Sequence, residues 1–181
     1  SEADGVAEFT VTASGDTEQV VTFDFATTDG DASSPDDYSA TTLTASTLDT
    51  ATDSLTVAIA LTDDAINEAT ETFTATISAV TGTGVTIATD TATATILDDD
   101  GLSLSVADVS VAESTGEASV TISLSQPSDQ AITVDYATTD VTASDASDYA
   151  GASGTLTFDA GSTSQTVGFT LSLSTDELIF Y

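Results

Sequence analysis

The sequence predicts an all-β protein made of two antiparallel β-sandwiches in series, and three observations support this. Apolar and polar residues alternate with period two in many short segments, and turn-forming residues separate those segments, while no segment has a helical period. The third observation is an internal repeat, because residues 2–38 align without a gap on residues 113–149. A repeat of about 110 residues has the size of one sandwich domain.

The first repeat contains five clear sets of residues that alternate with polar neighbours and should face a core. They are Ala7, Phe9 and Val11; Val21, Phe23 and Phe25; Leu55, Val57, Ile59 and Leu61; Phe73, Ala75 and Ile77; and Ala92, Ala94 and Ile96. Thr fills many of the intervening positions and suits the outer face of a strand. The run Thr81–Gly84 is typical of a turn.

The second repeat opens with a strand-like segment, Leu102–Val106, that has no counterpart before Glu2. Its inward sets are Ala118, Val120, Ile122 and Leu124; Ile132, Val134 and Tyr136; and Val167, Phe169, Leu171 and Leu173. We therefore expect a first domain at residues 1–100 that lacks its first strand and a second domain at residues 101–181 that lacks its last strands. Two incomplete domains in series are typical of a segment taken from a longer tandem array.

The charge composition excludes several classes of function. The chain has 31 acidic residues, no Lys, Arg, His or Cys, and a formal charge of −31. Binding to a nucleic-acid backbone needs cationic side chains, and an anionic membrane surface would repel the chain, so neither partner is expected. The sequence contains no run of about 18 apolar residues, so no membrane-spanning helix is predicted. Only oxygen ligands remain for a metal, and these suit hard cations.

The acids are concentrated where strands end. Because neighbouring strands run in opposite directions, the acids that follow alternate strands should gather at one pole of the sandwich. Nine are expected there: Glu2, Asp29, Asp63, Asp64, Glu68, Glu71, Asp98, Asp99 and Asp100. Such a cluster repels itself unless cations neutralise it, and Ca²⁺ takes six to eight oxygen ligands. The sequence therefore predicts a Ca²⁺ site, whereas scattered acids such as Glu8, Asp90 and Asp159 are interpreted as solvated surface.

Several motifs together resemble a Calx-beta domain: Glu2, the run Ala26–Gly30, the pair Asp37–Tyr38, the run Asp63–Phe73 and the run Asp98–Asp100. Calx-beta domains are seven-stranded Ig-like sandwiches that bind Ca²⁺ at one pole, in sodium–calcium exchangers, an integrin and large bacterial surface proteins. The resemblance implies the same nine acids as ligands, with the Ile66 carbonyl as a backbone ligand. The second repeat matches at Glu113, Asp140, Asp176 and Glu177, but it has Val141 where the first has Gly30.

The function expected from these features is that of a non-catalytic, Ca²⁺-binding repeat of an extracellular or cell-surface adhesin, filament or matrix protein. Its partners would be neighbouring repeats and other copies in a filament, and Ca²⁺ would stiffen the domains and their junction. The alternative is a subunit of a self-assembling filament, joined by strands exchanged between chains.

Two further roles have weaker support from the sequence. A glycosidase that uses a carboxylate pair is disfavoured, because Trp is absent and the acids are clustered as metal ligands would be. Ice or surface binding through Thr91, Thr93 and Thr95 stays open, although these residues are simply explained as an exposed strand face. Tyr38 and Tyr149 are interpreted as packing residues, and Asp37 and Asp148 as turn formers.

Overall fold

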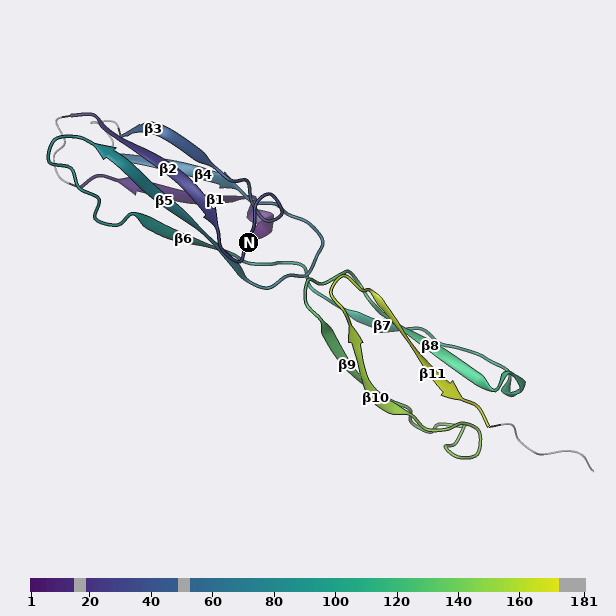
Figure 1. Cartoon of the computed structure of the whole chain (residues 1–181). Coiled ribbons are helices and arrows are strands. Elements are labelled where there is room, and N and C mark those ends of the chain that lie inside the picture. Colours follow the sequence, from purple (N-terminus) through teal and green to yellow (C-terminus); the bar gives the residue numbers. More distant parts are fainter. Residues whose placement is uncertain (15–18, 49–52, 173–181) are drawn as a thin grey trace, which may run out of the picture. The chain divides into compact units, whose positions relative to one another are not determined.

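The computed structural model describes residues 1–14, 19–48 and 53–172, and it confirms an all-β, antiparallel protein (Figure 1). The chain divides into two compact units. The first comprises Ser1–Asp64 and Ala69–Asp99, and the second comprises Ala65–Glu68 and the residues from Asp100 onward. The domain boundary expected at residues 100 and 101 stays a prediction. Among the described residues, no helix has the length and apolar character needed to span a membrane.

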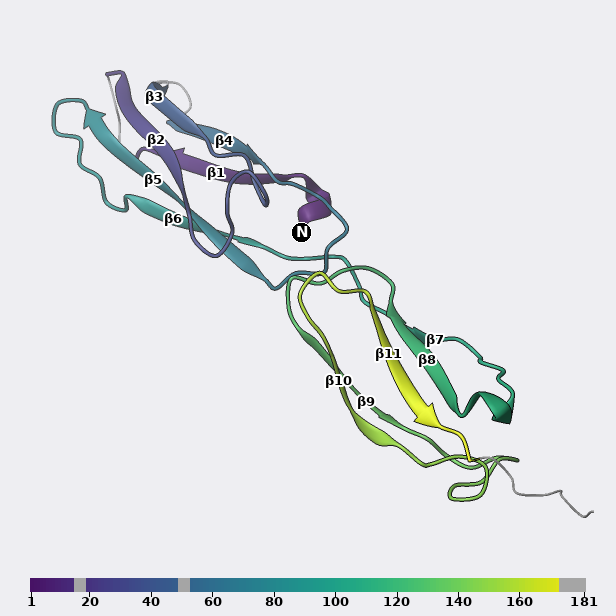
Figure 2. The ribbon, with the colours of Figure 1, turned by 45° about the vertical axis from the view of Figure 1, so that its right-hand side comes forward.

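The first unit is a sandwich of two antiparallel sheets (Figures 1 and 2). One sheet pairs β1 with β4, and the other has the order β3-β2-β5-β6. The bounds of these strands are β1 (Val6–Thr12), β2 (Val21–Asp29), β3 (Thr42–Leu48), β4 (Ser54–Ala60), β5 (Glu71–Thr81) and β6 (Thr91–Ile96). Each predicted inward set lies on one of these strands, except that Leu61 follows the end of β4, and no inward set was predicted for β3.

The core of the first unit forms between the two sheets. Most of the predicted inward residues are buried there, namely Phe9, Val21, Phe23, Phe25, Val57, Ile59, Phe73, Ala75 and Ile96. The Phe9 ring meets Phe25 and Phe73 edge to face, with centroid distances of 6.0 Å and 5.8 Å. Such aromatic pairs add about 0.5–1.5 kcal/mol each beyond area burial. These contacts tie β1 of one sheet to β2 and β5 of the other.

A single 3-10 turn precedes the first long strand of each repeat. These turns are η1 (Glu2–Asp4) and η2 (Glu113–Thr115). Gly5 and Gly116 end them with φ values of 70° and 74°. A left-handed backbone at both positions explains why the repeat has Gly there, since other residues adopt it only with strain.

The second unit contains five described strands. They are β7 (Leu104–Val106), β8 (Glu117–Leu124), β9 (Ile132–Ala137), β10 (Ser153–Phe158) and β11 (Ser164–Thr170). One sheet has the order β11-β8-β7, and β10 pairs with β9. Its buried apolar residues among those described are Leu124, Phe158 and Val167. Leu173, which the sequence places in an inward set, lies outside the described residues.

The segment Ala65–Glu68, between β4 and β5 in the chain, packs within the second unit. The Asn67 N–H donates to the Pro127 carbonyl at 3.0 Å, and the Asp129 N–H donates to the Asn67 carbonyl at 3.1 Å. The Ser128 hydroxyl also donates to the Asn67 carbonyl at 3.0 Å. Backbone pairing of this kind holds four residues of one repeat against the other repeat's loop.

Candidate metal centre

Strand pairing brings the ends of several strands to one pole of the first unit. Val6 pairs with Ala60, Asp29 with Phe73, and Glu71 with Ile96. The starts of β1 and β5 therefore lie beside the ends of β4, β2 and β6. The two sheets are joined at this pole, because the Glu2 N–H donates to the Leu97 carbonyl at 3.1 Å.

Three acids form a close group at this pole. Carboxylate oxygens of Glu2, Asp98 and Asp100 all lie within 4.8 Å of one another. Glu2 is only 3% exposed, and Asp98 and Asp100 are half-buried. Burial and like charge both raise the free energy of the ionised carboxylates. Glu2 opens η1, whereas the other two follow β6, so the group joins two segments that lie far apart in the sequence.

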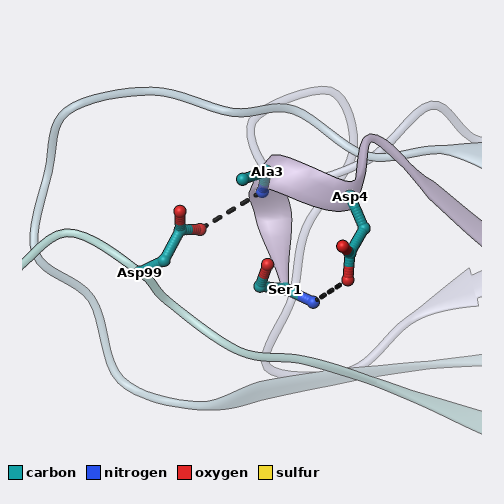
Figure 3. Close-up of polar contacts among 4 residues, drawn as sticks. All are labelled: Ser1, Ala3, Asp4 and Asp99. Atoms are coloured by element: carbon teal, nitrogen blue, oxygen red, sulfur yellow. Dashed lines mark hydrogen bonds and ion pairs between the residues drawn. The ribbon is translucent and has the colours of Figure 1, made fainter.

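The turn η1 is held against the acidic run by a further contact (Figure 3). The Ala3 N–H donates to Asp99 Oδ1 at 3.2 Å. On the other side of the turn, the Ser1 ammonium donates to Asp4 Oδ2 at 2.6 Å, and this contact lowers the pKa of Asp4. Asp99, one of the expected ligands, thus contacts the backbone of η1 in this structure.

Asp29, at the end of β2, is oriented by two donors. The Tyr38 hydroxyl donates to Asp29 Oδ1 at 2.6 Å, and the Ser34 N–H donates to the same oxygen at 3.2 Å. Tyr38 is fully buried and stacks on Phe73 with a centroid distance of 4.0 Å. Burial, followed by the hydrogen bond to Asp29, raises the pKa of Tyr38. Tyr38 is thus the packing residue that the sequence predicted, and it also positions an expected ligand.

The second repeat preserves this arrangement. The Tyr149 hydroxyl donates to Asp140 Oδ1 at 2.6 Å, and the Asp145 N–H donates to the same oxygen at 2.9 Å. The hydrogen bond from Tyr149 is the main cause that lowers the pKa of Asp140. Glu113, the counterpart of Glu2, is exposed in the part of the chain that the structure describes. Asp176 and Glu177 lie outside the described residues.

The other expected ligands occupy the segment between β4 and the start of β5. Asp63 and Asp64 are exposed, whereas Ile66, Glu68 and Glu71 are half-buried. In the part of the chain that the structure describes, only Glu2, Asp98 and Asp100 meet as a group of three or more acids within 4.8 Å. The assignment of the remaining acids and of Ile66 as ligands stays a prediction.

The sequence did not indicate that two further residues, Tyr38 and Asn67, contact the acidic segments. Tyr38 was interpreted only as a packing residue, but its spacing of nine residues from Asp29 recurs between Asp140 and Tyr149 and could have indicated a pair. Asn67 was assigned no role, yet its Nδ2 donates to the Asp100 carbonyl at 2.7 Å. The sequence signal for this contact was that Asn67 lies between two expected ligands, Ile66 and Glu68.

The turn after Asp29 explains a difference between the repeats. A Cβ atom at Gly30 would lie 2.3 Å from the Thr72 carbonyl oxygen, so this turn approaches β5 too closely for a side chain. The Ala32 N–H donates to the same carbonyl at 3.1 Å. Val141 occupies the equivalent place in the second repeat and is 93% exposed. The close approach of this turn to β5 therefore explains why the first repeat has Gly at position 30.

The sequence pattern of the Calx-beta domain matches residues 1–100 and again residues 101–179. The chain belongs to the Calx-beta family. No curated protein sequence is significantly similar to it.

Among solved structures, this Calx-beta chain resembles CBD12 from CALX1.2, with 24% identity and a TM-score of 0.51 over 94% of this chain and 69% of that one. The calcium binding domain CBD12 of CALX1.1 is similar, with 23% identity and a TM-score of 0.51 over 94% and 70%. The apo-form Calx CBD1 domain has 28% identity and a TM-score of 0.51 over 55% of this chain and 87% of that domain. These likenesses support the tandem sandwich fold.

The donor set of the acidic group in this Calx-beta chain fits a hard divalent cation. All three side chains offer carboxylate oxygens, which Ca²⁺ prefers. The sequence contains no Lys, Arg or His that could neutralise the buried Glu2 carboxylate. Nitrogen and sulfur donors, which softer metals prefer, are absent from the side chains because His and Cys do not occur in the sequence.

Proposed function

We propose that this chain is a non-catalytic, Ca²⁺-binding repeat module of an extracellular or cell-surface adhesin, filament or matrix protein. The observation that carries this proposal is the meeting of Glu2, Asp98 and Asp100 within 4.8 Å, with Glu2 buried. All three side chains offer carboxylate oxygens, which Ca²⁺ prefers, and they come from two segments that are far apart in the sequence.

The ion would act as a structural link at the pole. Glu2, Asp98 and Asp100 would hold it, and the expected ligands nearby would complete its coordination. Since Glu2 precedes β1 and Asp98 follows β6, a shared ion would tie one sheet of the sandwich to the other. This role needs no group that reacts, which supports a binding module rather than an enzyme.

The extracellular location is part of this proposal and is compatible with a weak Ca²⁺ site. Extracellular Ca²⁺ modules bind at roughly 0.1–1 mM, which suits an ion-rich medium in which every site is filled. The similar structure from CALX1.1 is described as a calcium binding domain, which supports the choice of ion.

Ca²⁺ titration by calorimetry tests this function. The wild-type chain, freed of metal with chelator and dialysed, should bind Ca²⁺, and Glu2→Gln should weaken the strongest site by at least about tenfold. Glu8→Gln is the matched control, because Glu8 is an exposed acid on β1 and its loss should leave binding unchanged. No Ca²⁺ binding by the wild type, or equal weakening by both variants, would contradict the proposal.

We extend this function to the junction between the repeats. In the sequence, a single residue, Gly101, separates the acidic run Asp98–Asp100 from Leu102. Without cations, three adjacent negative charges repel one another and Gly permits many backbone angles. Small-angle scattering should therefore give a narrower size distribution with Ca²⁺ than with chelator. Superimposable profiles from folded protein in both conditions would restrict Ca²⁺ to a local stabilising role.

The alternative function, self-assembly through exchanged strands, is favoured by a different observation. In the first unit, β1 pairs only with β4 among the described strands, and a groove lies beside it.

A further inference from the structure

The sequence contains three Asp–Gly pairs, at positions 4–5, 29–30 and 100–101. Such a pair can rearrange without an enzyme, because glycine has no side chain to obstruct attack of its backbone nitrogen on the carboxyl group of the preceding aspartate. In a folded chain the rearrangement depends on how firmly that nitrogen and that carboxyl group are held. The structure distinguishes the three pairs by these contacts.

Gly5 and Gly30 are both required by the fold. Gly5 has a left-handed backbone with a φ of 70°, and its N–H donates to the Glu2 carbonyl at 2.8 Å. A Cβ atom at Gly30 would collide with the Thr72 carbonyl oxygen, and the Gly30 N–H donates to the Ala32 carbonyl at 3.1 Å. In both pairs the attacking nitrogen is therefore engaged in a hydrogen bond.

The carboxyl group of Asp29 is held as well. Its Oδ1 accepts from the Tyr38 hydroxyl at 2.6 Å and from the Ser34 N–H at 3.2 Å. Attack of the Gly30 nitrogen on Asp29 would have to break these contacts together with the bond from Gly30 to Ala32. The fold therefore protects this pair at both reacting groups.

Gly101 differs from both of these glycines. It is exposed, its φ lies outside the left-handed region, and a Cβ atom there meets nothing within 4 Å. Neither the backbone nor the packing thus requires glycine at this position. Among the hydrogen bonds between described residues, none has the Gly101 N–H as its donor. No described contact of this nitrogen has to be broken before it attacks Asp100.

The carboxyl group of the third pair belongs to the acidic group at the pole. Asp100 is half-buried, and its carboxylate oxygen lies within 4.8 Å of those of Glu2 and Asp98. Like charges at this distance repel one another, so no attraction among the three acids holds the Asp100 side chain in place. A cation shared by the three carboxylates would hold it.

We propose that the Asp100–Gly101 peptide bond isomerises spontaneously in the folded chain, and that a cation held by the Asp100 carboxylate prevents this. The Gly101 nitrogen forms a bond to Asp100 Cγ, and the carboxyl hydroxyl and the amide proton leave together as water, which gives a succinimide ring. Water then adds to the Asp100 main-chain carbonyl carbon and breaks its bond to the Gly101 nitrogen. The product is isoaspartate, in which the chain continues through Cγ and the former main-chain carbonyl is a free carboxyl group.

The protection by a cation acts on the first of these steps. A carboxylate oxygen that ligates a cation cannot leave as part of a water molecule, and a ligated side chain cannot swing toward the Gly101 nitrogen. This cation dependence rests on the proposed function. The difference between the three Asp–Gly pairs does not, because it follows from contacts within the chain.

Isomerisation alters the acidic group itself. It adds one methylene carbon to the main chain between residues 100 and 101, and it shortens the side chain that carries the carboxylate by the same carbon. The carboxylate of residue 100 is then drawn back from Glu2 and Asp98, so the isomerised chain should bind Ca²⁺ more weakly. A period without the cation would thereby leave a lasting change in the module.

Incubation of the whole chain in warm, neutral buffer tests the proposal, with chelator and with about 10 mM Ca²⁺, above the roughly 0.1–1 mM expected of such sites. Electron-transfer mass spectrometry of chymotryptic peptides distinguishes isoaspartate from aspartate at each pair. With chelator, isoaspartate at residue 100 should form at least about tenfold faster than at residue 4 or 29. With Ca²⁺ at least about nine-tenths of the sites are filled, so this rate should fall about tenfold or more.

Gly101→Ala is the decisive variant, because the added methyl group obstructs the attack while the fold has space for it. It should fold and bind Ca²⁺ like the wild type, yet form at least about tenfold less isoaspartate at residue 100 with chelator. Gly168→Ala is the matched control. Gly168 is exposed, a Cβ atom there also meets nothing within 4 Å, and the preceding residue is Val167, so this variant should isomerise like the wild type.

Unfolding of the wild type in urea provides a second comparison. The three pairs should then isomerise at similar rates, because the fold no longer holds any of them. In the folded chain with chelator, isoaspartate formation at residue 100 that is no faster than at residue 29 overturns the proposal. An unchanged rate in Gly101→Ala overturns it as well.

The Ca²⁺ condition separates this proposal from the proposed function. If calorimetry shows that Ca²⁺ binds, equal rates with and without Ca²⁺ overturn the protection by the cation. Absence of calorimetric binding contradicts the proposed function alone, because the comparison of the three pairs in chelator is made without metal.

Discussion

The hydroxyl of Tyr38 donates a 2.6 Å hydrogen bond to Asp29, and Tyr149 makes the same 2.6 Å contact to Asp140 in the second repeat. In each pair the tyrosine follows the aspartate by nine residues, in the loop after β2 or after β9. A hydrogen bond to a charged acceptor is short and directional. The pair therefore fixes the orientation of an acid that we expect to face a cation, and it does so in both repeats.

Removal of the Tyr38 hydroxyl should cost stability without disturbing the core. Tyr38→Phe retains the ring that stacks on Phe73 but loses the bond to Asp29, so we expect the free energy of unfolding to fall by about 1–2 kcal/mol. Urea denaturation measures this change. Tyr149→Phe is the matched control and should have a smaller effect, because its hydrogen bond is exposed to solvent. An equal loss in both variants would contradict a special role for the buried pair.

The same pair predicts a stability change at high pH. Burial and the bond to Asp29 raise the pKa of Tyr38 above its ordinary value of 10.0, so the folded chain retains this proton where the unfolded chain loses it. This contribution to stability is complete below pH 10 and is lost as the pH rises through the raised pKa. Urea midpoints measured with chelator between about pH 9 and pH 12 should decline. Tyr38→Phe should flatten this decline, and an unchanged slope would count against the assignment.

Glu2→Gln should have opposite effects with and without Ca²⁺. With chelator, loss of one charge from the group with Asp98 and Asp100 should raise the free energy of unfolding by on the order of 1 kcal/mol. With Ca²⁺ at a hundredfold excess over its dissociation constant, the wild type should gain about 2.7 kcal/mol per site, and the variant should lose most of that gain. Thermal melts under both conditions measure this reversal. Destabilisation of the variant with chelator would show that Glu2 has a stabilising role without metal.

Gly30 should not tolerate a side chain. In Gly30→Ala the new Cβ would meet the Thr72 carbonyl oxygen at 2.3 Å, so the turn after Asp29 must move away from β5. We expect a loss of about 1–3 kcal/mol, which is typical of overpacking. Chemical denaturation measures it, with Gly101→Ala as the control, because a Cβ at Gly101 meets nothing within 4 Å. Similar midpoints for the two variants would show that the turn can yield.

Alternation along the chain located most of the strands, although it gave no inward set for β3 or β10. Val57 and Ile59 alternate with Thr56 and Ala58, and the structure places this set on β4 with the two apolar side chains buried. The repeat was equally visible in the sequence, where Gly5 aligns with Gly116, and the structure gives both residues a left-handed backbone. These features depend on neighbours in the sequence and on backbone sterics, so no knowledge of distant contacts was needed.

Long-range features could not be found in this way. The sequence placed nine acids at one pole by the direction of the strands, but it could not rank them. Neither Asn67 pairing with the Pro127–Asp129 loop nor the close approach of Gly30 to β5 has a local signature. Each depends on how loops from separate parts of the chain meet.

The sequence by itself determined that this chain is a tandem β protein with a polyanionic pole, since composition and period-two alternation are properties of the chain alone. Only the tertiary structure decided that Glu2 is 3% exposed and lies with Asp98 and Asp100, and that β1 borders a groove. The physical reason is that carboxylate burial and an open strand edge both depend on how the two sheets pack. Sheet packing brings together residues about a hundred positions apart, and a sequence pattern does not predict the distance between such residues.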